Sequence, residues 1–390
     1  MTSSPTTTRA ADVVFTFTFE TFSDAVHRGM NRPPDRLLQT LLESDRADRV
    51  LVANPWRSGP ARLARYALGR PDQPFPTTEK HSLVTPLRLF REEPADVPRL
   101  RALYERYDEQ LRAAASRRGM ERPAVITANP LVAGFSRFGW ASATTFYARD
   151  DWAELPARQR HWPAIRAAYR EMADSGIAVI AVSERILDRI GPTGPSGVVP
   201  NGVEPAEWAG PMPERPALYD GIEGPIALYV GTLDTRLDLE GLKVLAAARP
   251  ELQIVLLGAL GDAGYLAGIH ETPNVHVRPQ VSRDLLVAAI RHSDLCLVSH
   301  RRTALTEAMS PLKIYEYLAG GKPVLSIDLP PVRGIDRRVL LADSVADFPE
   351  LVDEALTLGT AGEDERLQFV ADNSWKKRHS DILDVALRNR

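Results

Sequence analysis

The sequence predicts an α/β protein whose two Rossmann-like domains face each other across a cleft. At 390 residues the chain is too long for one compact core and suits two domains of under about 200 residues each. Short apolar runs alternate with segments of helical periodicity throughout, which is typical of parallel βαβ units. A proline-rich passage from Pro200 to Pro216 separates the two halves and predicts a linker.

Apolar runs place the expected strands, and helical periodicity fills the segments between them. In the first half the strands are Val13–Phe17, Val50–Ala53, Ala124–Thr127, Ala143–Tyr147, Ile177–Val182 and Gly197–Val199, and the helices include Pro34–Ser44, Leu100–Arg117 and Pro163–Ser175. In the second half the strands are Ile226–Val230, Gln253–Leu257, Val275–Val277, Leu295–Val298, Pro323–Ile327 and Val339–Leu341. Ligands of such sheets bind beyond the carboxyl ends of the strands, so we expect functional residues in the loops there.

The composition excludes several classes of protein. A net charge of −3, with 44% apolar and 25% charged residues, is typical of a soluble globular protein and gives no electrostatic reason to bind nucleic acid. Residues 1–10 lack an apolar core and predict a disordered lead rather than a signal peptide. No run approaches about 18 apolar residues, so no membrane span is expected. The single cysteine, Cys296, cannot form an internal disulfide, which fits a reducing cytoplasm.

The stretch from Ser310 to Ser326 predicts a helix followed directly by a core strand. Pro311 suits the first helical turn, and Gly320 with Gly321 suits its end. The free amides at the start of such a helix suit an anion, and Glu316, two turns further on, suits hydrogen bonds from a diol. A nucleoside diphosphate offers both groups, so the stretch predicts a nucleotide site.

The same stretch resembles the donor-binding segment of family 4 type glycosyltransferases of the GT-B fold. That segment reads Glu, seven residues, Glu, an Ala/Gly-rich stretch and Lys-Pro-Val. Glu316 matches the second Glu, but Ala308 stands where the first belongs, and Glu307 lies one position away. Three further passages resemble the family in the same order: IAVIAVSERILDRI with VVPNGVEPAEW, then YVGTLDTRLDLEGLKVL, and finally NSWKKRHSDILDVAL.

This resemblance implies a domain plan and a reaction. It implies an acceptor-side domain at residues 11–205, a donor domain at 206–372, and a helix at 373–390 that returns to the first domain. The reaction would move a sugar from a nucleoside-diphosphate sugar to an acceptor hydroxyl with retention of configuration, without metal, cofactor or covalent enzyme nucleophile. The acceptor would be a carbohydrate, a lipid-linked molecule or a small molecule.

The donor site is expected at the strand ends of the second half. Backbone amides of Gly231 and Thr232 follow a strand and can face phosphate. Arg236 and Lys313 are the cations expected to stabilise the departing diphosphate, although Arg236 also suits a surface pair with Asp234 or Asp238. The full predicted donor set is Gly231, Thr232, Arg236, Glu307, Ser310, Pro311, Leu312, Lys313 and Glu316.

On the acceptor side, strand ends again supply the candidates. Asp150 is the predicted catalytic acid of this domain, beside Arg149, although Asp150 or Asp151 also suits a helix N-cap. Further acceptor contacts are predicted at His27, Arg28 and Asn129, which follow earlier strands.

The remaining sequence patterns give less information about function. No HExxH motif, cysteine cluster or Asp-x-Asp motif is found, so no metal site is expected. The glycines of residues 258–264 lack GxGxxG spacing and predict a turn at the cleft edge, near the nucleotide base. Leu100–Arg117 has a 3.6-residue apolar stripe that favours core packing, while its arginines leave open a weak peripheral contact with a membrane.

Two alternatives remain beside the transferase. One is a nucleotide-sugar epimerase on the same architecture, which the matched segments disfavour. The other is a catalytically inactive protein that binds a nucleotide sugar or a partner enzyme, and Ala308 keeps this reading open. If Ala308 belongs to an active site, the loss of a carboxylate there predicts a donor such as a deoxy sugar, or a site in which Glu307 takes over the contact.

Overall fold

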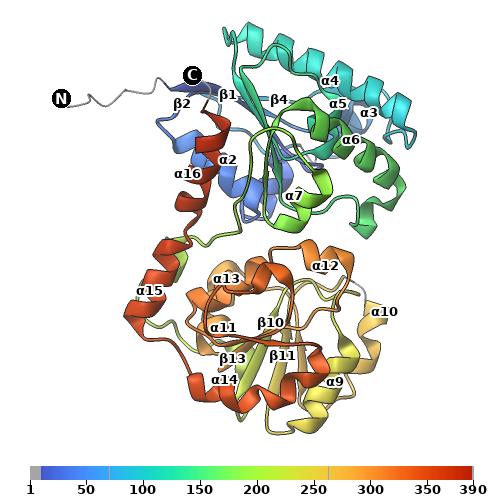
Figure 1. Ribbon diagram of the computed structural model, residues 1–390. Coiled ribbons are helices and arrows are strands. Elements are labelled where there is room, and N and C mark those ends of the chain that lie inside the picture. Colours follow the sequence, from blue (N-terminus) through green and yellow to red (C-terminus); the bar gives the residue numbers. More distant parts are fainter. Residues whose placement is uncertain (1–9, 70, 262, 389–390) are drawn as a thin grey trace, which may run out of the picture. The chain divides into compact units, whose positions relative to one another are not determined.

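The computed structural model describes residues 10–69, 71–261 and 263–388, and it divides into two compact units. The first comprises Met1–Pro200 and Arg378–Arg390, and the second Asn201–Lys377. The predicted lead lies almost wholly outside the described residues. Each unit is built around one parallel sheet (Figure 1), as the alternating pattern predicts.

The sheet of the first unit has the strand order β4-β2-β1-β6-β7-β8-β9, and all its pairings are parallel. Its strands are β1 (Ala11–Thr16), β2 (Ala47–Ala53), β4 (His81–Val84), β6 (Ala124–Thr127), β7 (Ala143–Ala148), β8 (Ala178–Ala181) and β9 (Ser196–Val198), and β3 (Arg57–Ser58) pairs separately with β5 (Leu87–Arg88). Its helices are α1 (Phe22–His27), α2 (Pro33–Glu43), α3 (Gly59–Ala67), α4 (Val97–Arg117), α5 (Pro130–Phe135), α6 (Trp162–Ser175) and α7 (Glu184–Ile190), with a 3₁₀ turn at Pro156–His161.

The second unit has a six-stranded sheet in the order β12-β11-β10-β13-β14-β15. Its strands are β10 (Ile226–Val230), β11 (Gln253–Leu257), β12 (Val275–Arg278), β13 (Leu295–Val298), β14 (Val324–Ile327) and β15 (Val339–Ala342). Its helices are α8 (Pro205–Trp208), α9 (Leu239–Ala248), α10 (Ala263–Leu266), α11 (Arg283–His292), α12 (Ala304–Ala308), α13 (Leu312–Ala319), α14 (Val352–Leu358) and α15 (Glu363–Asp372). Figure 1 shows β10, β11 and β13 at the centre of this unit with helices around them.

Three strands of the first unit were not predicted. Strands β3 and β5 have two residues each, and β4 is a largely half-exposed edge strand, so none leaves a buried apolar run in the sequence. The stripe on α4 is buried at Leu100, Tyr104, Tyr107 and Leu111, so this helix packs into the core of its unit.

The proline-rich passage was predicted to be a linker. In the structure it is part of the second unit. The units divide between Pro200 and Asn201, at the start of this passage. Val203 pairs with Ser374, and the indole of Trp208 at the end of α8 is fully buried. Burial of such a large ring fixes the passage against the second core.

The last helix, α16 (Trp375–Ala386), carries the chain from the second unit into the first. Within the first unit its buried side chains include Ile382, Leu383 and His379. The His379 Nδ1 atom lies 2.6 Å from the hydroxyl of Thr40 on α2. Burial, reinforced by the positive charge of Arg36, lowers the pKa of His379 to about 3, so its imidazole is neutral near pH 7.

Candidate functional site

The backbone at the carboxyl edge of the second sheet leaves room for only glycine at two positions. Gly231 directly follows β10 and has φ of +147°, and a Cβ there would lie 2.9 Å from the Nζ atom of Lys313. A Cβ on Gly258, which follows β11, would lie 1.8 Å from the carbonyl oxygen of Gly231. The ends of β10 and β11 therefore approach closely, and Lys313 reaches the turn at Gly231.

Lys313 is held by neutral groups. Its Nζ atom lies 3.1 Å from the Nε2 atom of His300 and 3.8 Å from the centre of the Tyr229 ring. Burial, followed by the positive charge of Arg236, lowers the pKa of Lys313 well below its usual range, against the opposing effects of Asp234 and Glu316. An anion bound beside Lys313 would favour its charged form.

His300 supports this lysine from the end of β13. The ring is 3% exposed, and its Nε2 atom also lies 3.3 Å from the Tyr229 hydroxyl. Burial lowers the pKa of His300 well below its usual range, and the charges of Lys313 and Arg236 lower it further. The imidazole is therefore neutral, and its Nε2 accepts a hydrogen bond from the lysine ammonium.

Arg236 lies in the loop that leaves Gly231 and Thr232. Its guanidinium forms a two-point contact with Asp234, with Nε–Oδ1 at 2.9 Å and Nη2–Oδ2 at 2.8 Å, and its side chain remains 32% exposed. Its carbonyl oxygen accepts a hydrogen bond from the backbone N–H of Arg301. Asp238 instead caps α9 by accepting from the Gly241 N–H. The loop thus holds Arg236, already paired with Asp234, near enough to Lys313 for the arginine charge to lower the pKa of the lysine.

The predicted helix start is correct within one residue. Pro311 is the N-cap, and α13 runs from Leu312 to Ala319. Ser310 is buried, and its carbonyl oxygen accepts a hydrogen bond from the side-chain amide of Asn201 at 2.7 Å. This bond anchors the segment before the helix, so it fixes where Lys313 emerges.

Glu307 and Ala308 lie on the preceding short helix, α12. The Glu307 carboxylate lies 3.7 Å from the Nη1 atom of Arg302, and Ala308 is buried. The motif departure at Ala308 therefore puts a methyl group inside the protein surface. The Glu307 carboxylate thus lies within ion-pair distance of Arg302.

Glu316 is largely buried and shares an arginine with another acid. Its Oε1 atom lies 2.5 Å from Nη1 of Arg283, while Nη2 of the same guanidinium lies 2.6 Å from Glu207. The Arg283 guanidinium also lies over the Trp208 ring, 5.8 Å from its centre. The carboxylate predicted to receive ribose hydroxyls thus already has one ionic partner.

The acceptor-side prediction brings Arg149 and Asp150 together. They form a salt bridge of 3.1 Å just beyond β7, and the Arg149 guanidinium lies 5.0 Å from the centre of the Trp152 ring. Asp151 is 1% exposed and binds Arg189 at 3.0 Å. Burial raises the pKa of Asp151, and Arg189 opposes this. Neither aspartate caps an α-helix here.

The structure gives structural contacts to the other three acceptor candidates. Asn129 is fully buried; its amide accepts hydrogen bonds from the first turn of α5 and donates to the Thr18 carbonyl at 2.5 Å. Arg28 binds the buried Asp35 through two contacts of 2.6 and 2.7 Å. His27 is exposed and lies 2.6 Å from the carbonyl oxygen of Ser23. The capping role of Asn129 removes its side chain from acceptor binding.

Sequence reasoning missed His300, Tyr229 and Arg283. His300 was detectable, because it lies two residues beyond a predicted strand. Tyr229 lies inside a predicted strand, and nothing in the sequence singles out Arg283, since its two acids are distant in sequence. Within the described ranges, no group of three or more potential metal ligands is found, and no helix is long and apolar enough to cross a membrane.

Comparison with known proteins shows which sequences and folds this chain resembles. Residues 240–384 match the family model described as glycosyl transferase-like. The Bacillus subtilis (strain 168) protein TuaH, assigned to teichuronic acid biosynthesis as a glycosyltransferase, is 27% identical over 156 residues. That alignment spans 39% of each chain, so this chain matches well under half the length of its curated relative.

Solved structures resemble almost the whole chain. An α,α-trehalose 6-phosphate synthase from Burkholderia multivorans aligns with a TM-score of 0.66 and 12% identity, over 97% of this chain and 98% of that one. A sucrose-phosphate synthase from Thermosynechococcus elongatus aligns with a TM-score of 0.64 and 14% identity, over 97% and 98%. An E. coli trehalose-6-phosphate structure bound with UDP-2-fluoro glucose aligns with a TM-score of 0.62 and 15% identity, over 97% and 96%. These similarities show the fold.

Proposed function

We propose that this chain, which has the GT-B fold and a second unit matching the glycosyl transferase-like family, moves a sugar from a nucleoside-diphosphate sugar to an acceptor hydroxyl. The observation that carries the proposal is the cluster of Lys313, His300 and Gly231 at the carboxyl edge of the second sheet. A lysine whose nearest partners are a neutral imidazole and an aromatic ring, beside a glycine turn, suits a diphosphate.

The proposed mechanism uses electrostatics rather than a covalent enzyme intermediate. Negative charge grows on the diphosphate as the glycosidic bond breaks, and preorganised cations stabilise that charge. In this proposal Lys313 and Arg236 supply the positive charge, together with the backbone amides of Gly231 and Thr232. The acceptor hydroxyl attacks from the face that the diphosphate leaves, which retains the anomeric configuration. Asp150, fixed by Arg149, is the proposed acid of the acceptor side.

Further elements of the proposal concern conditions. We propose that the reaction needs no metal or cofactor, because Lys313 and Arg236 stand where a cation would act. A reducing, cytoplasmic setting remains part of the proposal, because Cys296 is a buried free thiol whose pKa burial raises to about 12. The acceptor is a carbohydrate, a lipid-linked molecule or a small molecule.

The alternative is a GT-B protein that binds a nucleotide sugar without transferring it. Two observations favour it: Ala308 replaces the first acid of the motif, and Arg283 already engages the second, Glu316. An epimerase has no such support.

One experiment separates these functions. Calorimetric titration with a panel of nucleoside diphosphates tests binding, and mass spectrometry of products from pooled sugar donors and acceptors, with and without excess EDTA, tests transfer. The transferase reading expects binding and EDTA-resistant product. Binding without product supports the inactive reading, and product only after magnesium or manganese is restored would contradict the metal-free mechanism.

A further inference from the structure

A polar pocket lies wholly within the first unit, at the carboxyl edge of its sheet. The pocket has a volume of about 220 Å³ and is lined by Phe19, which follows β1, by Trp56 and Arg57, which follow β2, and by Arg158 and His161, which follow β7. This edge is where parallel sheets present their ligand sites.

Positive charge in this pocket is only partly balanced. Arg88 pairs with Glu93 at 2.9 Å, and Arg57 pairs with Asp24 at 3.1 Å. Arg158 differs from them, because it forms no salt bridge with any residue that the structure describes. Its guanidinium instead lies over the Phe19 ring, 3.7 Å from the ring centre.

The pocket is electrostatically unfavourable when empty. Burial lowers the pKa values of Arg57 and Arg158, although Asp24 opposes this for Arg57 and Glu93 for Arg158, and the positive charge of Arg57 lowers that of Arg158 further. The Nε2 atom of His161 is buried and has no hydrogen-bond partner among the described residues. A bound anion would relieve both problems, because it accepts hydrogen bonds and compensates the like charges.

A continuous stack connects this pocket with the predicted acceptor residues. The Phe19 ring packs edge-on against Trp152, with ring centres 5.1 Å apart, and Trp152 lies beneath Arg149. Arg158, Phe19, Trp152 and Arg149 therefore form one stack, in which two rings lie between two cations. The stack thus links Arg158, through the buried Trp152, to Arg149 and its salt-bridge partner Asp150.

We propose that this pocket anchors the acceptor and that it takes a phosphoryl group. Three separate donors converge from two loops, namely Arg57, Arg158 and His161. This arrangement suits a tetrahedral group with three terminal oxygens better than a planar carboxylate, which one arginine satisfies. The inference rests on the proposed function, and it names the acceptor class as phosphate-bearing.

The test is calorimetry on the full chain saturated with a nucleoside diphosphate, so that the donor site is filled. The titrants are a hexose 6-phosphate, the same hexose without phosphate, and a short-chain polyprenyl diphosphate hexose. The first and third distinguish a soluble acceptor from a lipid-linked one. Either should bind at least tenfold more tightly than the unphosphorylated hexose.

Variants assign the binding to this pocket. Arg158→Gln should weaken binding of the phosphorylated titrants at least tenfold and leave the hexose unchanged, while Arg158→Lys should give an intermediate loss. Arg137→Gln, at an arginine whose side chain is 86% exposed, is the matched control and should change nothing. Wild-type affinity in Arg158→Gln, or equal affinity for the hexose with and without phosphate, would overturn the proposal. Failure of any nucleotide to bind would instead count against the proposed function.

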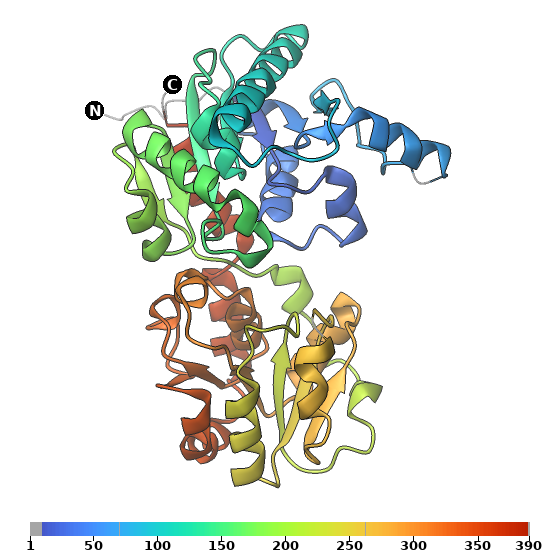
Figure 2. The same cartoon turned by 90° about the vertical axis from the view of Figure 1, so that its right-hand side faces the viewer.

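An independent observation concerns an exposed apolar surface of the same unit. No residue of α3 is buried, and Leu63, Tyr66 and Leu68 are 71–74% exposed. Leu89 and Phe90 are 82% and 64% exposed. Figure 2 shows α3 standing out from the body of the first unit. A contiguous apolar surface of this kind marks an interaction site.

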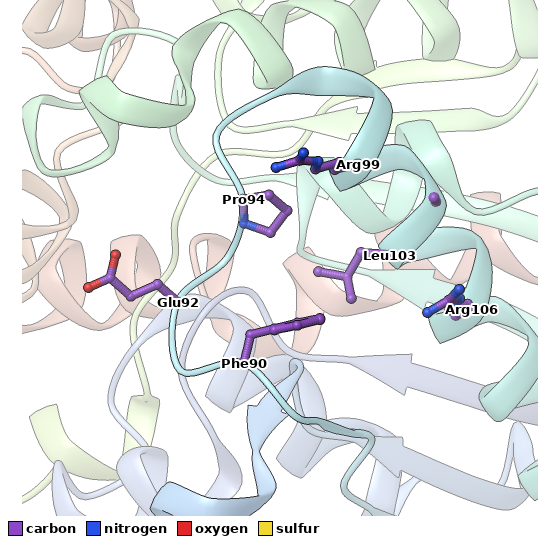
Figure 3. A pocket seen from close by; sticks show the side chains of 7 residues that line it. Phe90, Glu92, Pro94, Arg99, Leu103 and Arg106 are labelled. Carbon is purple, nitrogen blue, oxygen red and sulfur yellow. The ribbon is translucent and has the colours of Figure 1, made fainter.

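The two halves of this apolar surface belong together. Strands β3 and β5 pair in parallel, so α3 and the Leu89–Phe90 segment leave the same edge of that small sheet. Phe90 also borders a hollow of about 520 Å³. Pro94, which precedes α4, and Leu103, which lies on α4, face Phe90 there (Figure 3). Arginines surround the apolar side chains: Arg62, Arg65, Arg91, Arg99 and Arg106.

We infer that this surface lies on an anionic membrane. Exposed leucines and aromatic rings among arginines match the interface of such a bilayer, in which the rings enter the headgroup region and the arginines meet lipid phosphates. Fewer acids pair with these arginines, since Asp72 pairs with both Arg62 and Arg65, and Asp96 pairs with Arg99. The arginines of α4 alone would not form such a surface, because the apolar stripe of α4 is buried.

Sedimentation with vesicles tests this second inference. The full chain should bind phosphatidylcholine vesicles that contain phosphatidylglycerol and bind pure phosphatidylcholine at least fivefold less. Leu89→Ser with Phe90→Ser should abolish binding, while Met212→Ser, at an exposed apolar residue of the second unit, should not. Equal sedimentation of the wild type and the Leu89→Ser with Phe90→Ser variant with the phosphatidylglycerol vesicles would overturn the inference. So would self-association of the wild type, measured by analytical ultracentrifugation, that Leu89→Ser with Phe90→Ser removes, because the surface would then bind a second copy.

Discussion

Arg283 joins two carboxylates, and we expect Arg283→Met to destabilise the second unit by about 2–4 kcal/mol. The guanidinium lies 2.5 Å from Glu316 and 2.6 Å from Glu207. Removing one partner of a buried ion pair costs about 3–5 kcal/mol, because the remaining charge is left unpaired. The side chain of Arg283 is 24% exposed, so water compensates part of this loss. For a unit of this size the melting temperature should fall by roughly 4–16 °C.

A double-mutant cycle in a scanning calorimeter measures the contact directly. Glu316→Gln removes the charge and keeps the shape, so it should lessen the penalty of Arg283→Met, with a coupling energy of about 2 kcal/mol. Arg337→Met, at an arginine 67% exposed and paired with Glu365, is the matched control and should melt with the wild type. A coupling below about 0.5 kcal/mol would refute the shared-arginine reasoning.

Three further outcomes are expected. Arg236→Ala should lower turnover more than donor affinity, because its partner is charge that develops during transfer; equal losses in steady-state kinetics would mark a ground-state contact instead. Glu307→Ala should leave donor use unchanged, because the carboxylate faces Arg302, and deoxy-sugar donors should outperform hydroxylated ones beside Ala308; abolished transfer from a hydroxylated donor would show that Glu307 contacts the sugar. The free energy of unfolding, measured by urea titration, should fall by about 2 kcal/mol when the pH is lowered from about 6.5 to about 5. Over this range the unfolded chain protonates the imidazole of His379, while the folded chain, in which that pKa is about 3, does not. His379→Asn should flatten this pH dependence.

The alternation of apolar runs and helical segments was enough to predict both sheets. Runs such as Ile226–Val230 and Leu295–Val298 are predicted residue by residue, because a strand buried on both faces needs an uninterrupted apolar stretch. Strand β4 was not predicted, because an edge strand needs no such stretch. The proline-rich passage was predicted to be a linker, because the burial of Trp208 depends on residues far away in the sequence.

The candidate site was predictable where it depends on chain direction. Gly231, Arg236 and Lys313 were found because they follow strands or start a helix, and those positions are local properties. The contacts that decide their chemistry are not local: Lys313 with His300, Glu316 with Arg283, and the burial of Asn129 all depend on packing between segments.

The central claim is that Lys313 holds the diphosphate of a nucleotide donor, and a calorimetric comparison of Lys313→Met with the wild type tests it most directly. With a nucleoside diphosphate as titrant, loss of one charge-assisted contact of about 1.5–3 kcal/mol predicts a tenfold or greater loss of affinity, while the parent nucleoside should bind both proteins equally. Lys243→Met, at a lysine 37% exposed and paired with Glu240 in the same unit, controls for the loss of a positive charge. Wild-type affinity for the diphosphate in Lys313→Met, with Lys243→Met unchanged, would contradict the account.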